Sequence, residues 1–323
     1  MVLDFSLPSS RLAQLRRGAV AVVEDAAVFR VEGSGALTCL QGLLTSDLAG
    51  PGDGSFVYGA LLTPKGMIIV DPWVIREGEQ LTVLVPREAH ITTSELFKRT
   101  LPPRLARVTD LSDSWRVAWL LGLTAAERLA RNGGPVLPGA GKAQRLGDLL
   151  LAGGTPAAPF VGALVGPEAP LSEAIARFEL AGGRPGTETD LAAARLLAGW
   201  PTLGREIEER TLPQEVRFDE LGAVSYVKGC YTGQETVARV HFRGHVNRTL
   251  RGLVFPGGEP VGERTLVAAG KDVGQVRTGL VLDDRVLALA TVRHEVTDGT
   301  TVTAGGRPAR LVPLPFDAEQ AGH

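Results

Sequence analysis

The run of residues best suited to chemistry is Lys228-Gly-Cys-Tyr-Thr-Gly-Gln-Glu235, in which two glycines flank a cysteine and a tyrosine. The pattern that follows predicts a helix from Gln234 to about His241. A thiol just before a helix N-terminus and close to a lysine has a lowered pKa when both groups face it. We therefore expect a reactive thiol at Cys230 tuned by Lys228, although the same spacing also suits a small buried cysteine in a glycine-rich turn.

A basic segment follows this motif. Four arginines fall within 13 residues: Arg239, Arg243, Arg248 and Arg251. No Asp or Glu occurs between positions 236 and 258. Arginine binds carboxylates and phosphates through paired N–H groups. Two interpretations stay open, a site for an anionic ligand or RNA and a solvated face paired with acids such as Glu206.

Other residues give weaker indications. Asp47, after an apolar helix, fits a polar stop or a ligand contact, and Asp71, before Pro72, fits a buried acid at a strand end or a turn former. Trp73 and Trp200 are more typical of core than of stacking platforms. The sequence contains no Walker A, GxSxG or strand-linked GxGxxG motif, which argues against a nucleotide kinase, an α/β-hydrolase and a Rossmann enzyme. With two cysteines and no HExxH pair, we expect no metal site.

Composition limits the class of protein. The chain has 323 residues, 34 Lys and Arg against 36 Asp and Glu, and a net charge of −2. This balance argues against a generically basic nucleic-acid binder, and the length predicts about two domains. No apolar run reaches the length of about 18 residues that a membrane helix needs. Asp4 and Pro8 argue against a signal peptide, so we expect a cytoplasmic protein that does not enter membranes.

The elements that must position these residues fall into two groups. The first is mixed α+β, with strands predicted over 20–24, 27–31, 56–63, 67–75, 81–85, 104–111 and 115–121. Its helices are predicted over 34–44, 88–98, 171–180 and 190–198, with a further short one opened by a capping box at 124–127. The second group is four short strands at 250–255, 265–269, 273–282 and 286–292, which predict a small antiparallel barrel. We place the domain boundary near residue 245, giving domains 1–245 and 246–323.

The cysteine motif, followed by Val237-Ala-Arg239 and Arg243-Gly244, resembles the signature of the YgfZ-type folate-binding proteins. These are relatives of the glycine-cleavage T-protein, a tetrahydrofolate-dependent aminomethyltransferase. Five further stretches are similar to that family: 40–47, 59–66, 198–201, 212–215 and 273–279. The resemblance covers the chain from about residue 27 to residue 293.

The resemblance implies a fold and a function. The fold is α+β, a three-part cloverleaf of ferredoxin-like parts around a central channel that holds folate, with a C-terminal antiparallel β-barrel; residues 1–245 form two interleaved subdomains. The function is that of a tetrahydrofolate-binding accessory protein for iron–sulfur cluster assembly or repair and for the tRNA modification that depends on it. Iron–sulfur enzymes or assembly proteins are the implied partners.

The resemblance also assigns site residues. Cys230, Lys228 and Asp71 are the implied chemical groups. The implied folate contacts are Asp47, Trp200, Tyr231, Gln234, Glu235, Arg239 and Arg243.

Two departures favour the YgfZ-type branch over a working aminomethyltransferase. Leu197 occupies the place of the Glu that grips the pterin ring in the transferases, and the transferases lack a cysteine at the place of Cys230. A folate-dependent one-carbon transferase, with Asp71 as acid or base, is the alternative, so catalysis stays open. An RNA- or protein-binding module is the second alternative. No Trp or Tyr follows Tyr231, so the basic segment has few aromatic side chains on which bases could stack. We therefore do not expect direct nucleic-acid binding.

Overall fold

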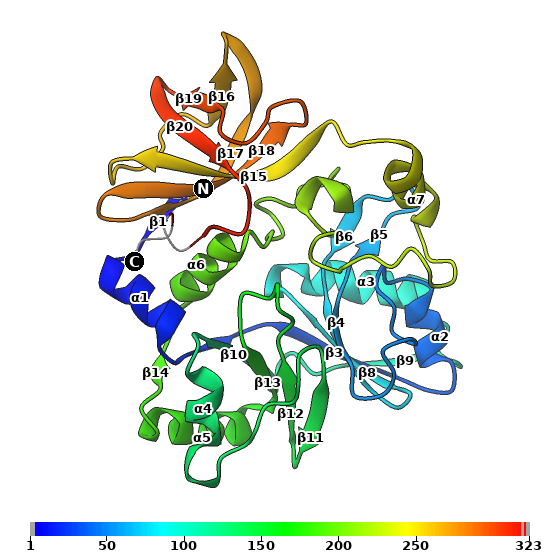
Figure 1. Cartoon of the computed structure of the whole chain (residues 1–323). Coiled ribbons are helices and arrows are strands. Elements are labelled where there is room, and N and C mark those ends of the chain that lie inside the picture. The colour runs from blue at the N-terminus through cyan, green and yellow to red at the C-terminus, as the bar shows by residue number, and fades with distance from the viewer. Residues whose placement is uncertain (1–3, 318–319, 321–323) are drawn as a thin grey trace.

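Three large β-sheets with their helices make up the structure, a computed structural model that describes residues 4–317 and residue 320 (Figure 1). The chain is mixed α+β and ends in an antiparallel barrel, as the sequence predicts. Strands β2 and β3 follow each other directly but enter different sheets, so the first two sheets are built from interleaved parts of the chain.

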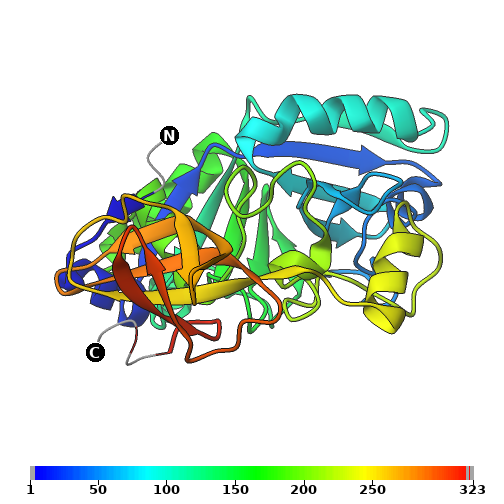
Figure 2. The same cartoon turned by 90° about the horizontal axis from the view of Figure 1, so that it is seen from above.

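The first large sheet has five strands in the order β4-β7-β8-β3-β9. They are β3 (Ala27–Glu32), β4 (Phe56–Tyr58), β7 (Trp73–Glu77), β8 (Gln80–Val85) and β9 (Arg107–Asp110). Two short strands, β5 (Leu61–Leu62) and β6 (Ile68–Val70), pair beside it. Helices α2 (Ala36–Gln41) and α3 (His90–Thr100) belong to this part, and Figure 2 shows α3 covering its outer face.

The second large sheet has six strands in the order β11-β12-β13-β10-β2-β14. They are β2 (Val20–Glu24), β10 (Trp115–Leu121), β11 (Ala143–Leu146), β12 (Leu149–Gly153), β13 (Gly162–Pro167) and β14 (Arg184–Pro185). Its helices are α4 (Ala125–Ala130), α5 (Glu168–Leu180) and α6 (Glu188–Ala198).

Alternation along the strands creates the central core. On β10, Ala118 and Leu120 pack in the cluster of α4 and α5, whereas Val117 and Trp119 point to the other face. Successive strand residues point to opposite faces, so one strand contributes to two clusters. The five-stranded sheet sends Trp73 into the same central cluster. The two sheets therefore share a core between them.

The barrel closes on itself. Each of its six strands pairs antiparallel with two others, and β17–β18 and β15–β20 complete the ring. The strands are β15 (Arg248–Pro256), β16 (Thr265–Ala268), β17 (Lys271–Val281), β18 (Arg285–Arg293), β19 (Thr301–Ala304) and β20 (Arg307–Val312). Strand β1 (Asp4–Ser6) pairs parallel with β17, so the N-terminal segment joins the C-terminal barrel before helix α1 (Ser9–Arg17).

Several predicted elements need correction. The strands predicted over 56–63 and 67–75 are each broken, into β4 and β5 and into β6 and β7. The capping box predicted at Thr124 is wrong, because Thr124 makes no side-chain cap bond. A capping box does form at α6, between Thr187 and Asp190. The sequence pattern does not predict β20, because Pro308 interrupts it.

Candidate functional site

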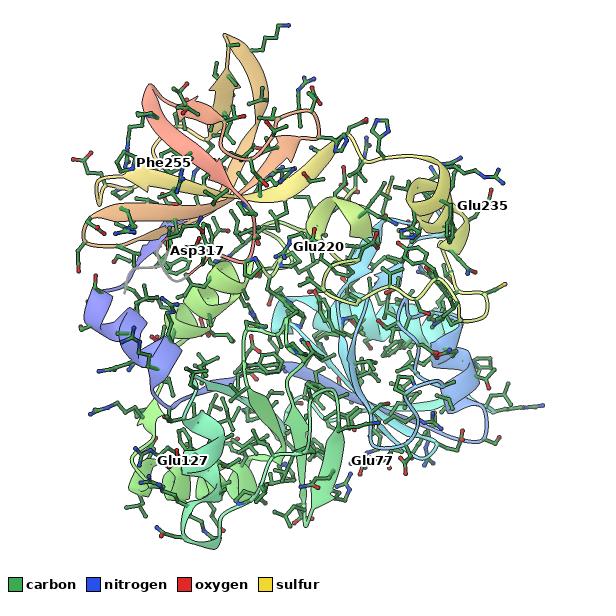
Figure 3. The ribbon with its side chains drawn as sticks, viewed as in Figure 1. Glu77, Glu127, Glu220, Glu235, Phe255 and Asp317 are labelled. Atoms are coloured by element: carbon green, nitrogen blue, oxygen red, sulfur yellow. The ribbon has the colours of Figure 1, made fainter. Side chains whose placement is uncertain are left out.

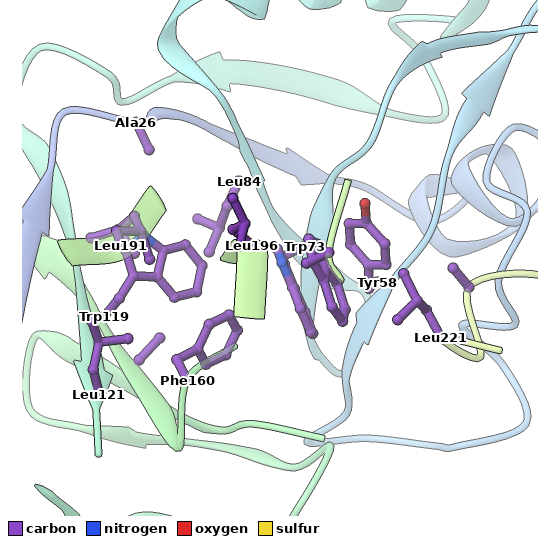
Figure 4. Close-up of a cluster of buried hydrophobic side chains, with 14 of the residues drawn as sticks. Ala26, Tyr58, Trp73, Leu84, Trp119, Leu121, Phe160, Leu191, Leu196 and Leu221 are labelled. Atoms are coloured by element: carbon purple, nitrogen blue, oxygen red, sulfur yellow. The ribbon is translucent and has the colours of Figure 1, made fainter. Parts of the chain in front are cut away.

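A cavity lined by aromatic rings lies in the shared core of the two sheets. Five rings line it: Tyr58, Trp73, Trp119, Phe160 and Trp200. The rings of Trp73 and Trp200 stack, with centroids 5.5 Å apart and an interplanar angle of 12°. Figure 4 shows Tyr58, Trp73, Phe160 and Trp119 following one another through the core. Flat aromatic faces of this kind suit a planar ligand.

Asp71 contributes a buried carboxyl group to this cavity. It follows β6, is 8% exposed, and is therefore a buried acid at a strand end. Tyr58 Oη donates to its Oδ2 at 2.8 Å, while its Oδ1 has no hydrogen-bond partner among the described residues. Burial raises the pKa of Asp71 to about 7, although the bond from Tyr58 and the charge of Arg195 favour the ionised form. A carboxyl group that titrates near neutrality can exchange a proton with a ligand.

Glu24, at the end of β2, is the second carboxylate of the cavity. Trp119 Nε1 donates to one of its oxygens, and Arg195 of α6 donates to the other at 3.3 Å. Glu24 is not among the residues predicted from the sequence, although the sequence carries a signal for it. Val20, Val22 and Glu24 alternate onto one face of β2, and the two valines are buried, so an acid continues an apolar face.

Two larger cavities adjoin the aromatic cavity. One, of about 320 Å³, shares Glu24 and Arg195 with it and is also lined by Arg87 and Arg205. The other, of about 600 Å³, shares Tyr58 with it. The aromatic cavity itself has a free volume of about 40 Å³, enough for one or two water molecules. The aromatic cavity therefore shares lining residues with each of the two larger cavities.

Lys228 anchors the cysteine motif to the end of α2. Its Nζ donates to the carbonyl oxygens of Gln41, Leu44 and Ser46 at 2.7, 2.7 and 2.9 Å. The same ammonium lies 5.1 Å from the ring centroid of Tyr231, which is 6% exposed. Burial lowers the pKa of Lys228 to about 8, against the opposing charge of Asp47. The ammonium is therefore a structural clamp for the loop.

Cys230 is exposed on that loop. The loop is fixed on its C-terminal side as well, since Thr232 N donates to Gly42 O at 3.0 Å. No described residue of the 228–235 motif lines the aromatic cavity. The structure thus brings Asp71 and Trp200 together in the core and places Cys230 in a separate, outward-facing region.

None of the other predicted contacts lines the aromatic cavity. Asp47 lines the cavity of about 600 Å³. Burial raises the pKa of Asp47, but hydrogen bonds from the Gly50 and Ala49 amides and from the Gln41 side chain outweigh this effect. The pKa of Asp47 is therefore below its ordinary value. The remaining residues belong to α7 (Gln234–Arg243), whose first turn holds Gln234 and the exposed Glu235 (Figure 3) and whose later turns hold the exposed Arg239 and Arg243.

Over positions 4–317 and 320, no group of three or more His, Cys, Asp or Glu side chains is placed to hold a metal ion. Within the same ranges, no helix has both the length and the apolar character needed to cross a bilayer.

Comparisons with known proteins agree with this architecture. The GCVT N-terminal domain family matches residues 14–134. The tRNA-modifying protein YgfZ of Cronobacter sakazakii is 27% identical over 319 residues, which are 93% of each chain. The tRNA-modifying protein YgfZ of an Enterobacter species is 26% identical over 315 residues, 92% of this chain and 93% of that one.

A solved structure extends the likeness to the whole fold. The aminomethyltransferase T of the glycine cleavage system of Bartonella henselae superposes with a TM-score of 0.79 at 22% identity, over 96% of this chain and 89% of that one. At that identity the match speaks for the fold alone. Together with the two full-length relatives and the matched N-terminal domain, it shows that the chain is similar to YgfZ-type proteins over 93% of its length and to the glycine-cleavage T-protein in its fold.

Proposed function

We propose that the chain binds a reduced folate in a channel through the core shared by its first two sheets and acts as an accessory protein in iron–sulfur-dependent tRNA modification. The folate part rests on one observation, the buried Asp71 with an unpartnered oxygen in a cavity lined by five aromatic rings. The tRNA part is supported by the two full-length relatives, which are named for tRNA modification.

The chemistry of the cavity lining fits a pterin ring. A pterin is flat, and its pyrimidine edge carries N–H donors that need acceptors in a buried site. Trp73 and Trp200 offer flat faces, and Asp71 and Glu24 offer carboxylate oxygens. Leu197, at the place of the pterin-gripping Glu of the transferases, packs against the core and does not line the cavity. In this proposal, Asp71 and Glu24 accept the hydrogen bonds of the pterin N–H groups in place of that Glu.

The size of the cavity adds a condition. Its free volume of about 40 Å³ is far below that of a bicyclic ring. The proposal therefore includes a separation of the aromatic side chains when the ligand enters, and this should change the fluorescence of Trp73 and Trp200.

The neighbouring cavity suits the other end of a folate. Its volume is about 320 Å³, and Arg87, Arg195 and Arg205 line it together with several acids. Guanidinium groups pair well with carboxylates such as those of the glutamate tail. The proposal assigns the tail to Arg87 and Arg205, because Arg239 and Arg243 line neither cavity.

Cys230 has a role outside the channel in this proposal. Its thiol is exposed and the loop around it is held by Lys228. One cysteine does not hold an iron–sulfur cluster alone. An exposed thiol on an anchored loop suits a contact with a partner protein, such as an iron–sulfur enzyme or an assembly protein.

A second candidate function is a folate-dependent one-carbon transferase. The observation that favours it is Asp71, whose pKa of about 7 suits an acid or base acting on a folate nitrogen or a substrate amine. The two candidates differ in turnover. An accessory protein binds tetrahydrofolate and releases it unchanged, whereas a transferase converts it when an aminomethyl or methylamine donor is added.

The deciding experiment incubates the protein with tetrahydrofolate and such donors and follows the folate by chromatography. Unchanged folate, together with measurable binding, supports the accessory role. Formation of a one-carbon folate that Asp71→Asn abolishes establishes the transferase instead.

A further inference from the structure

Helix α7 presents unpaired cations next to an exposed aromatic ring. Arg239 and Arg243 are exposed and form no ion pair with any described residue, and Phe242 is 67% exposed. The single acid of this helix, Glu235, lies in its first turn. By contrast, Arg248 and Arg251 are paired, with Glu215 and Asp298. Half of the arginines of the basic segment are therefore neutralised by acids, and the two arginines of α7 remain free to bind an anion.

The exposed ring belongs to a fixed aromatic cluster. Tyr226 stacks on His241 with centroids 3.7 Å apart, and Phe242 meets Tyr226 and His241 edge-on at 5.8 and 4.8 Å. Asp219 holds both partners, accepting from Tyr226 Oη and lying 3.2 Å from His241 Nδ1. Tyr226 comes from the loop before the cysteine motif, so the sequence alone does not place it beside the arginines. The cluster gives the basic surface the stacking platform that the linear sequence lacks.

The segment that follows α7 leads to a polar cleft on the barrel. Its volume is about 640 Å³, and it lies between the segment that follows α7 and strands β17 and β18. Five basic or imidazole side chains line it: His245, Arg248, Arg277, Arg293 and His294. Two acids, Asp272 and Glu295, also line it. Arg277 is 9% exposed and is held in place by Thr291 and Glu208.

We propose that the exposed face of α7 and this cleft together bind single-stranded RNA, with Arg239 and Arg243 on phosphates and Phe242 stacking on an unpaired base. Phosphate contacts by arginine with bases stacked on aromatic rings are the general mode of single-strand binding. An acidic protein segment would use the cations but has no need of the stacking platform. This site is separate from the folate cavity and does not depend on it.

The test is fluorescence anisotropy with a labelled RNA hairpin that has an unpaired loop, and with the same RNA closed into a full duplex. The wild-type chain should bind the looped hairpin, and the logarithm of its affinity should fall linearly with the logarithm of the salt concentration. Arg239→Glu/Arg243→Glu should weaken binding by at least about tenfold and reduce the slope by more than about 1. Phe242→Ala should abolish the preference for the looped hairpin over the duplex.

The matched control is Arg99→Glu/Arg104→Glu, which changes two exposed arginines elsewhere on the surface and should leave RNA binding unchanged. Tetrahydrofolate binding by the α7 variant, measured in parallel, separates this proposal from the folate proposal. Absence of RNA binding by the wild-type chain at low salt would overturn the inference. The inference would also be overturned if the control variant lost as much RNA affinity as the α7 variant. It would be overturned as well if poly-L-glutamate displaced the labelled RNA as effectively as the unlabelled RNA does.

Discussion

Tyr58 donates its phenolic hydrogen to Asp71 inside the central core, at 2.8 Å, and leaves the second oxygen of the carboxyl group without a described partner. Both side chains are buried, at 4% and 8% exposure. An ionised carboxylate is costly in such surroundings, so the pKa of Asp71 lies at about 7. A polar pair this deep in an apolar core is where ligand chemistry is best sought.

The first prediction concerns stability and pH. An unfolded Asp ionises near pH 4, whereas folded Asp71 keeps its proton up to about pH 7. Because the folded state holds this proton more tightly than the unfolded state does, the contribution of Asp71 to the free energy of unfolding is highest below about pH 4. It falls as the pH rises from about 4 to about 7. Asn does not ionise, so the free energy of unfolding of Asp71→Asn should rise by roughly 2–4 kcal/mol relative to that of wild type as the pH increases across that range. Urea unfolding at several pH values measures this.

The exposed Asp113 provides the control for this series, since Asp113→Asn should follow the wild-type pH dependence. If Asp71→Asn and wild type lost stability in parallel as the pH rose, the account of Asp71 as a neutral buried acid would be wrong.

The second prediction concerns the clamp formed by Lys228. Lys228→Met removes three charge-assisted bonds to carbonyl oxygens near the end of α2. Such a loss should lower the free energy of unfolding by about 2–4 kcal/mol and speed hydrogen exchange in the loop that carries Cys230. Lys142→Met is the matched control, because the exposed Lys142 makes one bond, to Pro51 O at 3.1 Å. Similar losses in both variants would refute the clamp.

The third prediction separates the two cysteines. Cys230 is exposed and Cys39 is half-buried, so a thiol-labelling reagent should modify Cys230 first. Cys230→Ser should abolish support of iron–sulfur-dependent tRNA modification in cells while changing stability by less than about 0.5 kcal/mol. Cys39→Ser should retain that function. A Cys230→Ser strain with normal tRNA modification under oxidative stress would remove the thiol from the proposal.

Much of the fold can be predicted from local patterns. Strand Val20–Glu24 and the start of Ala27–Glu32 agree with the predicted ranges, because β-branched residues and alternation are strong local signals. The end of α6 is also predictable, since Gly199 takes a left-handed conformation with a φ of 62°. The predicted split into domains 1–245 and 246–323 stays a prediction, and β1 adds an N-terminal strand to the barrel.

Local sequence patterns predict less of the site than of the fold. Asp71 and Trp200 are singled out individually, but their meeting depends on how two sheets and α6 pack, which no local pattern encodes. Glu24 becomes a cavity residue through Trp119 and Arg195, which lie far from it in the chain. The motif that stands out most in the sequence, around Cys230, lies outside the cavity.

The central claim is that Asp71 and Glu24 hold a folate in the aromatic cavity, and calorimetric titration with tetrahydrofolate tests it most directly. The wild-type chain and Cys230→Ser should bind alike, because Cys230 does not line the cavity. At pH 8, above the pKa of Asp71, Glu24→Gln and Asp71→Asn should each bind about 10- to 100-fold more weakly, the cost of losing a hydrogen bond to a charged group. Glu32→Gln, which changes an acid that pairs with the exposed Arg107 and does not line the cavity, should bind like wild type. No binding by the wild-type chain, or equal binding by all variants, would contradict the claim.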